Sequence, residues 1–291
     1  MARVERIYIA RHGFRANWQS SNWTTPTNLP RDPPLTAFGI VRGTESLVIR
    51  LDLTTSISQA QAKELAEYFK AMPPDERPTA IFSSPFYRCL QTATPVAQQL
   101  NIPLYVEHGI SEWFTPVVPG TGRHPRPTDA TYLKQHVPLV DPSWRSTWLA
   151  SRSGETTAEL YERTRGFLEA FVPRVEFTLS GHQRILLIGH AATVISLVHS
   201  LIGENVSLRV GCATLTVLDR ASTGDDVVGA WKPVGTLASG EFLSGGVQRD
   251  WGMEDAVLEH GEVVLEPGEP VTDWDIDTAT GLQWHPSKSK M

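Results

Sequence analysis

The chain has 291 residues, of which 41% are hydrophobic and 20% are charged, and its formal net charge is −6. This length and composition fit one large globular domain with a buried core, with or without an elaboration. The mild acidity argues against direct nucleic-acid binding, because such a surface needs a basic stripe that neutralises several phosphates.

Two cysteines, Cys89 and Cys212, are too few for a disulfide framework and have no metal-ligand spacing. A reducing compartment is therefore expected. The first apolar run begins so close to the N-terminus that no signal peptide fits before Arg11. No apolar run approaches the roughly 20 residues of a membrane span. We expect a soluble intracellular protein without membrane contact, in the cytoplasm or the nucleus.

In the first part of the chain, short apolar runs alternate with amphipathic stretches. The predicted elements are a strand over 7–10, a loop over 14–36, a helix over 60–72, a strand over 80–82, a helix over 86–100 and a strand over 104–106. Pro73 and Pro74 end the first helix. Pro95 is an unfavourable member of the second, since proline removes a helical hydrogen bond.

The second part repeats the alternation after an irregular stretch over 115–153. Thr156 and Glu159 form a capping-box pattern at the start of a long helix, and a strand over 185–188 precedes a helix over 192–202. From Gly211 onward the pattern changes. Short β-prone pieces over 213–218 and 227–231 predict strands or a hairpin at the sheet edge, followed by a poorly ordered tail.

This order of elements predicts an α/β fold: a mainly parallel central sheet with helices on both faces and a C-terminal β-containing elaboration. In open sheets of this kind, ligands bind at the carboxyl ends of the strands. Two histidines, His12 and His190, directly follow predicted strands. A strand-turn-helix junction also presents unpaired N–H groups, so the same edge attracts anions.

The residues around these strand ends suit a phosphate group. Arg11, Arg15 and Arg88 supply planar, permanently charged groups that bind phosphate oxygens in pairs. A neutral imidazole held there can attack phosphorus and form a covalent intermediate, which makes His12 the predicted nucleophile. His190 is predicted to stabilise the transferring group electrostatically.

Glu112 is the predicted general acid for the leaving group. It follows a strand and is flanked by Trp113 and Phe114. Apolar neighbours are expected to raise the pKa of its carboxyl toward neutrality. The alternative for this residue is a helix cap.

At these residues the chain resembles the histidine phosphatase superfamily, in the branch that contains phosphoglycerate mutase and fructose-2,6-bisphosphatase. The resemblance is carried, in order, by Arg11-His12-Gly13, Ser83-Ser84-Pro85 with Arg88, Gln91-Thr92-Ala93, Glu112, Gly154-Glu155-Thr156 and Gly189-His190. It implies a phosphohistidine at His12, proton transfer by Glu112, and no metal or other cofactor. It also implies phosphate contacts from Arg11, Arg88 and His190, with Arg15 and Asn17 at further phosphate-contacting positions.

A second likeness is to the phosphatase-like subunits of fungal RNA polymerase III transcription factor C. It is carried by residues 8–18, 84–90 and 109–113 and by Glu241-Phe242-Leu243-Ser244-Gly245-Gly246 before Trp251. This likeness implies a rival function, in which the fold is a non-catalytic assembly module with a protein partner in a transcription complex.

The resemblance also suggests how the chain is divided. Residues 1–210 are expected to form a histidine phosphatase-like catalytic domain, 211–265 a β-rich elaboration of the same domain, and 266–291 the tail. Residues 41–58 interrupt the family pattern, as either a surface insertion or a gene-model artefact such as an unspliced intron. A surface insertion would cost little closure entropy.

Three functions are weighed. The first is a metal-independent phosphatase acting on a small phosphorylated substrate. The second is the assembly module. The third, a secreted-type acid phosphatase, is disfavoured, because that branch has His-Asp where this chain has His190-Ala191. Mutase activity is not expected, since 115–153 lacks a motif for a second phosphate. The physiological substrate and oligomeric state stay open. The aromatic segments 18–23 and 144–148 are expected to cover the core rather than line a pocket.

Overall fold

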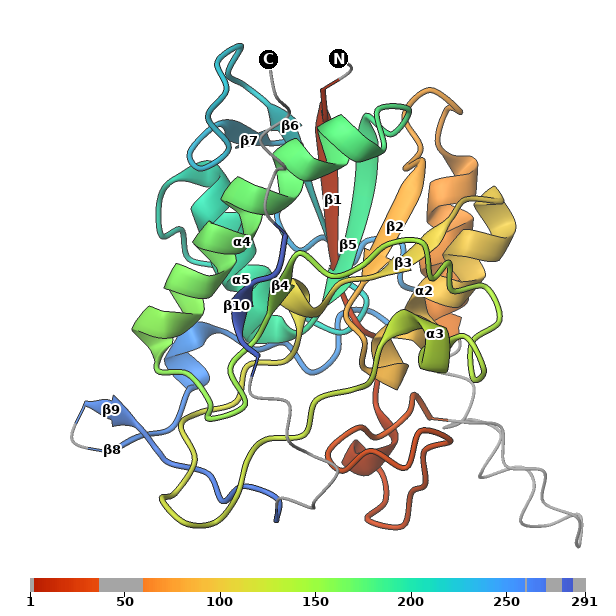
Figure 1. The fold of residues 1–291 in the computed structure, drawn as a ribbon. Helices are drawn as coiled ribbons and strands as arrows, with labels where there is room; N and C mark the ends of the chain where they lie inside the picture. Colours follow the sequence, from red (N-terminus) through yellow and green to blue (C-terminus); the bar gives the residue numbers. More distant parts are fainter. Residues whose placement is uncertain (1–2, 37–59, 260, 271–278, 285–291) are drawn as a thin grey trace, which may run out of the picture.

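A six-stranded sheet forms the centre of the protein (Figure 1). The computed structural model describes residues 3–36, 60–259, 261–270 and 279–284, so the predicted insertion at 41–58 lies outside the described residues. The strand order is β3-β2-β5-β1-β6-β7. The bounds are β1 Arg6–Arg11, β2 Ala80–Ser83, β3 Leu104–Val106, β5 Arg184–Gly189, β6 Leu215–Arg220 and β7 Trp231–Pro233.

The first four strands along the chain in this sheet are parallel, as predicted. β5 pairs with both β1 and β2, and β2 pairs with β3. β6 and β7 are antiparallel additions, and β6 lies directly against β1. The expected strand over 227–231 begins only at its last residue, Trp231. The C-terminal β segment is therefore part of the main sheet and covers what would otherwise be a free edge of β1.

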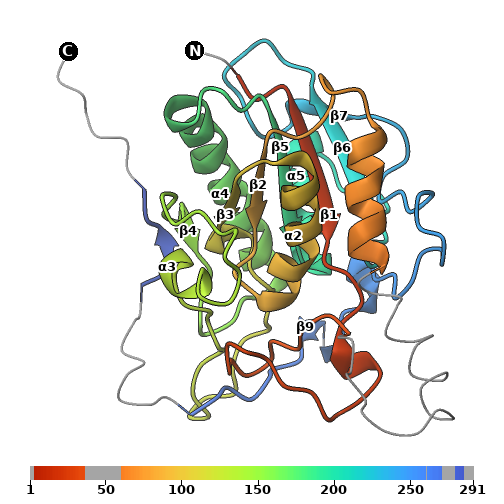
Figure 2. The same cartoon turned by 90° about the vertical axis from the view of Figure 1, so that its right-hand side faces the viewer.

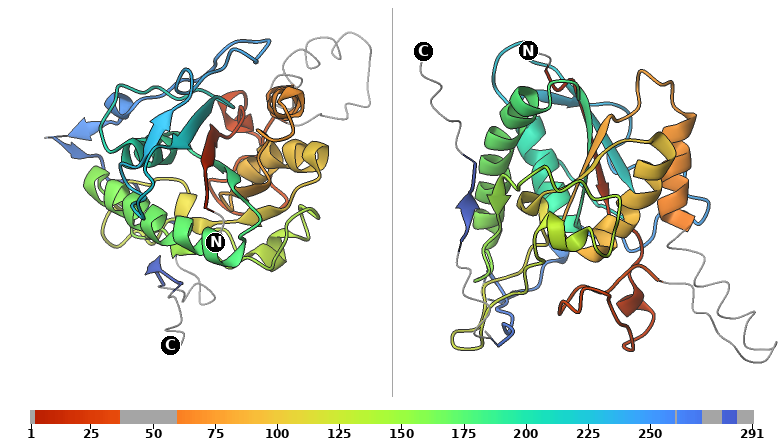
Figure 3. Two further views of the ribbon diagram at one scale, coloured as in Figure 1. Left: turned by 90° about the horizontal axis from the view of Figure 1, so that it is seen from above. Right: turned by 45° about the vertical axis from the view of Figure 1, so that its right-hand side comes forward.

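Helices pack on both faces of the sheet, which confirms the predicted fold class. α4 Thr157–Thr178 and α5 Ala191–Ile202 pack on one face, and residues 60–71 and α2 Tyr87–Leu100 pack on the other. Figure 3 shows the two helical layers with the sheet between them. Alternate residues of β1 divide accordingly: Ile7 and Ile9 join the first core, and Tyr8 joins the second.

Local signals fix the helix ends. The Thr156 hydroxyl accepts from the Glu159 backbone N–H, and the Glu159 carboxylate accepts from the Thr156 N–H, which confirms the capping box of α4. α2 continues past Pro95 and ends at Leu100, and the capping residue Asn101 has a left-handed φ of 53°. No helix among the described ranges is both long and apolar enough to cross a membrane.

Short elements complete the fold. They are η1 Ala16–Trp18, η2 His108–Ile110, α3 Ala130–Leu133, β4 Trp148–Leu149, η3 Met253–Asp255, β8 Leu258–Glu259, β9 Glu262–Val263 and β10 Gly281–Leu282. β10 pairs with β4. The loop after β1, the segment near 112–127 and the chain near 250–270 gather below the carboxyl edge of the sheet (Figures 1 and 2).

Candidate active site

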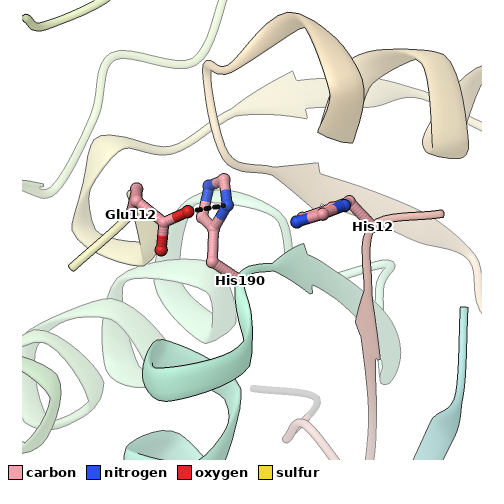
Figure 4. Close-up of side chains that lie close together, drawn as sticks. All are labelled: His12, Glu112 and His190. Carbon is pink, nitrogen blue, oxygen red and sulfur yellow. Dashed lines mark ion pairs between the residues drawn. The ribbon is translucent and has the colours of Figure 1, made fainter. Parts of the chain in front are cut away.

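The two predicted histidines lie at the carboxyl ends of adjacent parallel strands. His12 follows β1 and His190 follows β5, and the His12 backbone N–H donates to the Gly189 carbonyl at 3.0 Å. This hydrogen bond extends the strand pairing beyond β1 and fixes both residues at one edge. Their rings lie 5.4 Å apart between centroids, edge to face (Figure 4).

His12 is held as a neutral imidazole. Its ring is buried, and its Nδ1 lies 2.7 Å from the Gly13 carbonyl oxygen. A carbonyl oxygen only accepts, so Nδ1 carries the proton and Nε2 keeps its lone pair. Burial, and then the positive charges of Arg88 and Arg11, hold the pKa of His12 well below its usual range. The free nitrogen is therefore available as a nucleophile at neutral pH.

His190 is fixed from two sides. Its Nε2 lies 2.8 Å from the Ser84 hydroxyl, and its Nδ1 lies 3.2 Å from Glu112 Oε2. With its proton on Nδ1 the ring donates to the carboxylate and accepts from Ser84 at Nε2. With its proton on Nε2 it donates to Ser84 and accepts at Nδ1 from Arg88 NH2, which lies 3.2 Å away. Burial lowers the pKa of His190 to about 4, although the Glu112 carboxylate acts to raise it. The ring is neutral at physiological pH.

Arg88 connects the histidines to two carboxylates. Its side chain is fully buried; NH1 donates to Asp32 Oδ1 at 3.1 Å, and NH2 donates to Glu112 Oε2 at 2.9 Å. Asp32 also accepts from the Tyr87 N–H at the start of α2. Asp32 therefore holds both the helix and the guanidinium in place. Asp32 was not predicted, because it lies in a proline-rich loop without periodicity.

Arg11 and Arg15 bring further positive charge to the same place. Arg11 is buried and donates to the carbonyls of Val210 and Arg249. The Arg15 guanidinium lies 4.5 Å from the centre of the Trp18 ring, and Trp18 also stacks on His12. Burial, and then Arg88, lower the pKa of Arg15 to about 10, so it stays charged at neutral pH.

Glu112 corrects one expectation. Burial acts to raise the pKa of its carboxyl, but His190, Arg88 and Arg15 together hold that pKa well below its usual range. The prediction that apolar neighbours bring it toward neutrality was wrong for the unliganded site. The flanking aromatic residues are neighbours in sequence, whereas the groups that decide the pKa are neighbours in space: His190 follows β5, Arg88 lies on α2 and Arg15 follows β1.

These residues surround one cavity of about 520 Å³. Arg11, His12, Arg15, Asn17, Arg88 and Glu112 all line it. His190 lies behind Glu112 and Arg88, and the cavity wall there is formed by Ala191 and Ala192. The structure thus brings every predicted site residue to one place.

Other wall residues were not predicted. They are Trp23, Arg31, Pro33, Trp113, Phe114, Trp251 and Glu266. The expectation that the segment 18–23 covers the core was wrong for Trp23, which lines the cavity. Trp144, in the second aromatic segment, lies in the core as predicted, but it also lines a second cavity away from this site. Trp251 lies outside any amphipathic pattern, and no sequence signal indicated its place in the wall.

The chemistry of the cavity favours an anion. Ligand atoms of His12, Glu112 and His190 all lie within 4.8 Å of one another, a spacing that could also hold a cation. Four guanidinium groups, those of Arg11, Arg15, Arg31 and Arg88, line the same space, and Arg88 already contacts Glu112. Repulsion from these charges disfavours a metal ion, whereas an oxyanion with several oxygens matches them.

A mainly parallel sheet with two histidines at its carboxyl edge is the architecture of histidine phosphatases. The model of the histidine phosphatase superfamily (branch 1) matches residues 51–230, more than half of the chain, and the chain belongs to this superfamily. The matched stretch contains Arg88, Glu112 and His190, while His12 precedes it.

Individual relatives fall into two groups. The chain is 33% identical to the transcription factor tau 55 kDa subunit of Saccharomyces cerevisiae, over 94% of this chain and 66% of that protein. It is 24% identical to the ecdysteroid-phosphate phosphatase of Drosophila melanogaster, over 66% of this chain and 26% of that protein. The chain therefore spans less than two thirds of the length of each.

A solved structure has the same fold. It is the ecdysone phosphate phosphatase from Bombix mori in complex with tungstate, with a TM-score of 0.55 and 18% identity, covering 80% of this chain and 92% of that one. At this identity the likeness concerns the fold.

Proposed function

We propose that this protein is a metal-independent phosphatase that hydrolyses phosphomonoesters through a phosphohistidine at His12. The observation that carries the proposal is the state of His12: a neutral imidazole with its Nε2 lone pair free, in a cavity bordered by Arg11, Arg15 and Arg88. A nucleophile beside fixed positive charges suits attack on a phosphate dianion.

The first step forms the covalent intermediate. The phosphate oxygens bind Arg11, Arg15 and Arg88, and Asn17 lines the same cavity. The Nε2 lone pair forms the N–P bond while the ester P–O bond breaks, and Glu112 gives a proton to the leaving oxygen. His190 stabilises charge on the transferring group. The His12 Nδ1–H stays hydrogen-bonded to the Gly13 carbonyl oxygen, which stabilises the positive charge that develops on the ring.

Glu112 is ionised before substrate binds, so it takes up a proton from solvent water as the substrate enters. A phosphate dianion that takes Arg88 and Arg15 as partners removes the charges that hold the pKa of Glu112 low and adds negative charge beside it. Substrate binding thus prepares the acid. In the second step the carboxylate accepts a proton from water, whose oxygen attacks phosphorus, and the N–P bond breaks to release phosphate and His12.

The relationship to the yeast subunit supports a second candidate function, an assembly module with a protein partner in a transcription complex. In that case the protein acts in the nucleus; as a phosphatase, it acts in the cytoplasm or the nucleus. The buried Arg88 ion pairs would then serve only to hold α2 and the loop containing Asp32 together.

Hydrolysis of p-nitrophenyl phosphate in the presence of EDTA separates the two functions. We expect turnover that survives chelation and is lost in His12→Ala. His182→Ala is the matched control, because His182 precedes β5 at the opposite end of that strand from the cavity. A folded wild-type protein that is inactive at every pH from acid to neutral would favour the assembly module.

A further inference from the structure

A second cavity, of about 820 Å³, lies away from the proposed catalytic site. Its walls come from the end of β3, the start of α3, the segment leading into β4, helix α4 and the residues after β10. Figure 1 shows β4 and β10 beside α4, with α3 on the other side of them, below β3. The two cavities share no lining residue.

The distinctive residue in this second cavity is Arg174, which is 8% exposed. Its NH1 donates to the Thr147 hydroxyl at 3.0 Å, and its Nε is buried without a hydrogen-bond partner. No carboxylate lies within ion-pair distance of it among the residues that the structure describes. Glu107 acts on it electrostatically, but the Glu107 oxygens accept from backbone N–H groups and from the Trp144 indole.

A buried arginine without a carboxylate partner is unusual in this protein. The described residues include four buried arginines, Arg11, Arg88, Arg163 and Arg174. Arg88 and Arg163 have carboxylate partners. Arg11 has none in the described part of the chain, and it lines the proposed phosphate site. A buried charge without an opposite charge costs stability, and an anionic ligand is one reason to keep it.

The surroundings of Arg174 hold its guanidinium in place before any ligand binds. Its guanidinium lies 4.0 Å from the centre of the Trp144 ring and 5.6 Å from that of Trp284. Contact with two indoles restricts its rotation and lowers the entropy cost of binding. Arg145 lines the same cavity, is exposed, and has no ion pair within the described ranges. The acidic wall residue Asp129 is engaged as the cap of α3.

We propose that this second cavity is a non-catalytic site for a small ligand bearing an oxyanion, phosphate or carboxylate, which binds Arg174 and Arg145. The cavity has room for more than the anion itself, and Trp284 provides an aromatic wall for the remainder. Arg174 is a buried donor held against two indoles, and Arg145 is an exposed donor in the same wall.

The test uses the whole chain with its tryptophan indoles labelled for NMR. Trp284 reports the second cavity and Trp251 reports the proposed catalytic cavity, each assigned by replacement with Phe. Inorganic phosphate and citrate are titrated separately, which distinguishes the two sources of oxyanion. We expect at least one of them to shift the Trp284 indole signal along a saturable curve.

Variants give the decisive comparison. Arg145→Gln removes an exposed group, so the fold is kept, and it should weaken the response of Trp284 about tenfold or more while that of Trp251 is unchanged. Arg174→Lys keeps the positive charge but loses the planar guanidinium with its paired donors, and it should also weaken the response of Trp284. Arg165→Gln, an exposed arginine on α4 outside the cavity, is the control. No shift of Trp284 with either anion, or an equal shift in Arg145→Gln, overturns the proposal.

Discussion

At the scale of single residues, Arg88 is the most constrained group in the proposed catalytic cavity. Asp32 holds one end of its guanidinium and Glu112 the other. An incoming phosphate must therefore compete with Glu112 but not with Asp32. Asp32 keeps the fork oriented, and Glu112 occupies the position that a phosphate oxygen would take.

Arg88→Lys should weaken binding while keeping the charge. A lysine cannot contact Asp32 and a phosphate oxygen with the same fixed fork, so we expect the inhibition constant of inorganic phosphate to rise about 10- to 100-fold. Competitive inhibition of p-nitrophenyl phosphate hydrolysis measures it. Arg165→Lys, an exposed substitution on α4, should leave the constant unchanged. An unaltered constant in Arg88→Lys would remove Arg88 from phosphate binding.

The role of Glu112 can be read from its dependence on the leaving group. Glu112→Gln keeps the shape of the side chain but cannot give a proton. We expect alkyl phosphates, whose leaving groups need protonation, to slow by about 10²- to 10⁴-fold, and aryl esters with acidic leaving groups to slow much less. Comparing kcat for both ester classes measures this. Equal losses would contradict the acid role.

At the scale of elements, the start of α4 holds the segment around Glu112 in place. Its Arg163 forms an ion pair with Glu155 at 2.7 Å and donates to the Gly109 carbonyl, just before the segment that contains Glu112. The Glu155 carbonyl in turn accepts from the Trp113 indole. The start of α4 is therefore tied to both sides of Glu112.

Thr156→Ala should destabilise the protein without a large change in chemistry. Loss of the cap leaves helix N–H groups without a partner, which costs about 1 kcal/mol of unfolding free energy. Urea denaturation measures the change, and KM below the transition should stay near the wild-type value. Glu159→Gln keeps an acceptor for the Thr156 N–H and should cost less. Equal stability of Thr156→Ala and wild type would show that the capping box contributes little.

Sequence alone predicted the elements whose signals are local. The strands before His12 and His190 are short apolar runs, and the start of α4 has its own cap, so all three were found. Asp32 and Trp251 were missed because each reaches the cavity from an irregular segment. The prediction for the pKa of Glu112 was also wrong. A pKa depends on the groups that are near in space, and Arg88 and His190 are distant from Glu112 along the chain.

At the scale of the whole molecule, buried neutral histidines predict sensitivity to acid. Burial lowers the pKa of both His108 and His190 to about 4. In the unfolded chain each takes up a proton near its ordinary value of 6.5. The unfolded state thus binds more protons between these values, and the unfolding free energy falls as pH decreases from 6.5 toward 4, by about 3 kcal/mol for each residue at the lower end.

Replacing His108 tests this dependence away from the catalytic cavity. His108 contacts the Ser146 hydroxyl and the Pro127 carbonyl. His108→Gln should be less stable at pH 7 but should lose less stability than wild type between pH 6.5 and 4, measured by urea unfolding. Ser146→Ala removes one of these hydrogen bonds and keeps the titrating ring, so its slope should match wild type. If the unfolding free energy of His108→Gln fell with pH as steeply as that of wild type, His108 would not be a source of the acid sensitivity.

The position of β1 has a consequence for synthesis. β1 leads into His12, the proposed nucleophile, yet β5 and β6, the strands on either side of β1, lie in the second half of the chain. At about 5–20 residues per second, a nascent chain waits roughly 10–40 s after its first strand emerges from the ribosome before the last of these partners is translated. During that interval an apolar strand has both edges open, so this protein should depend on co-translational chaperones more than one built from sequential hairpins.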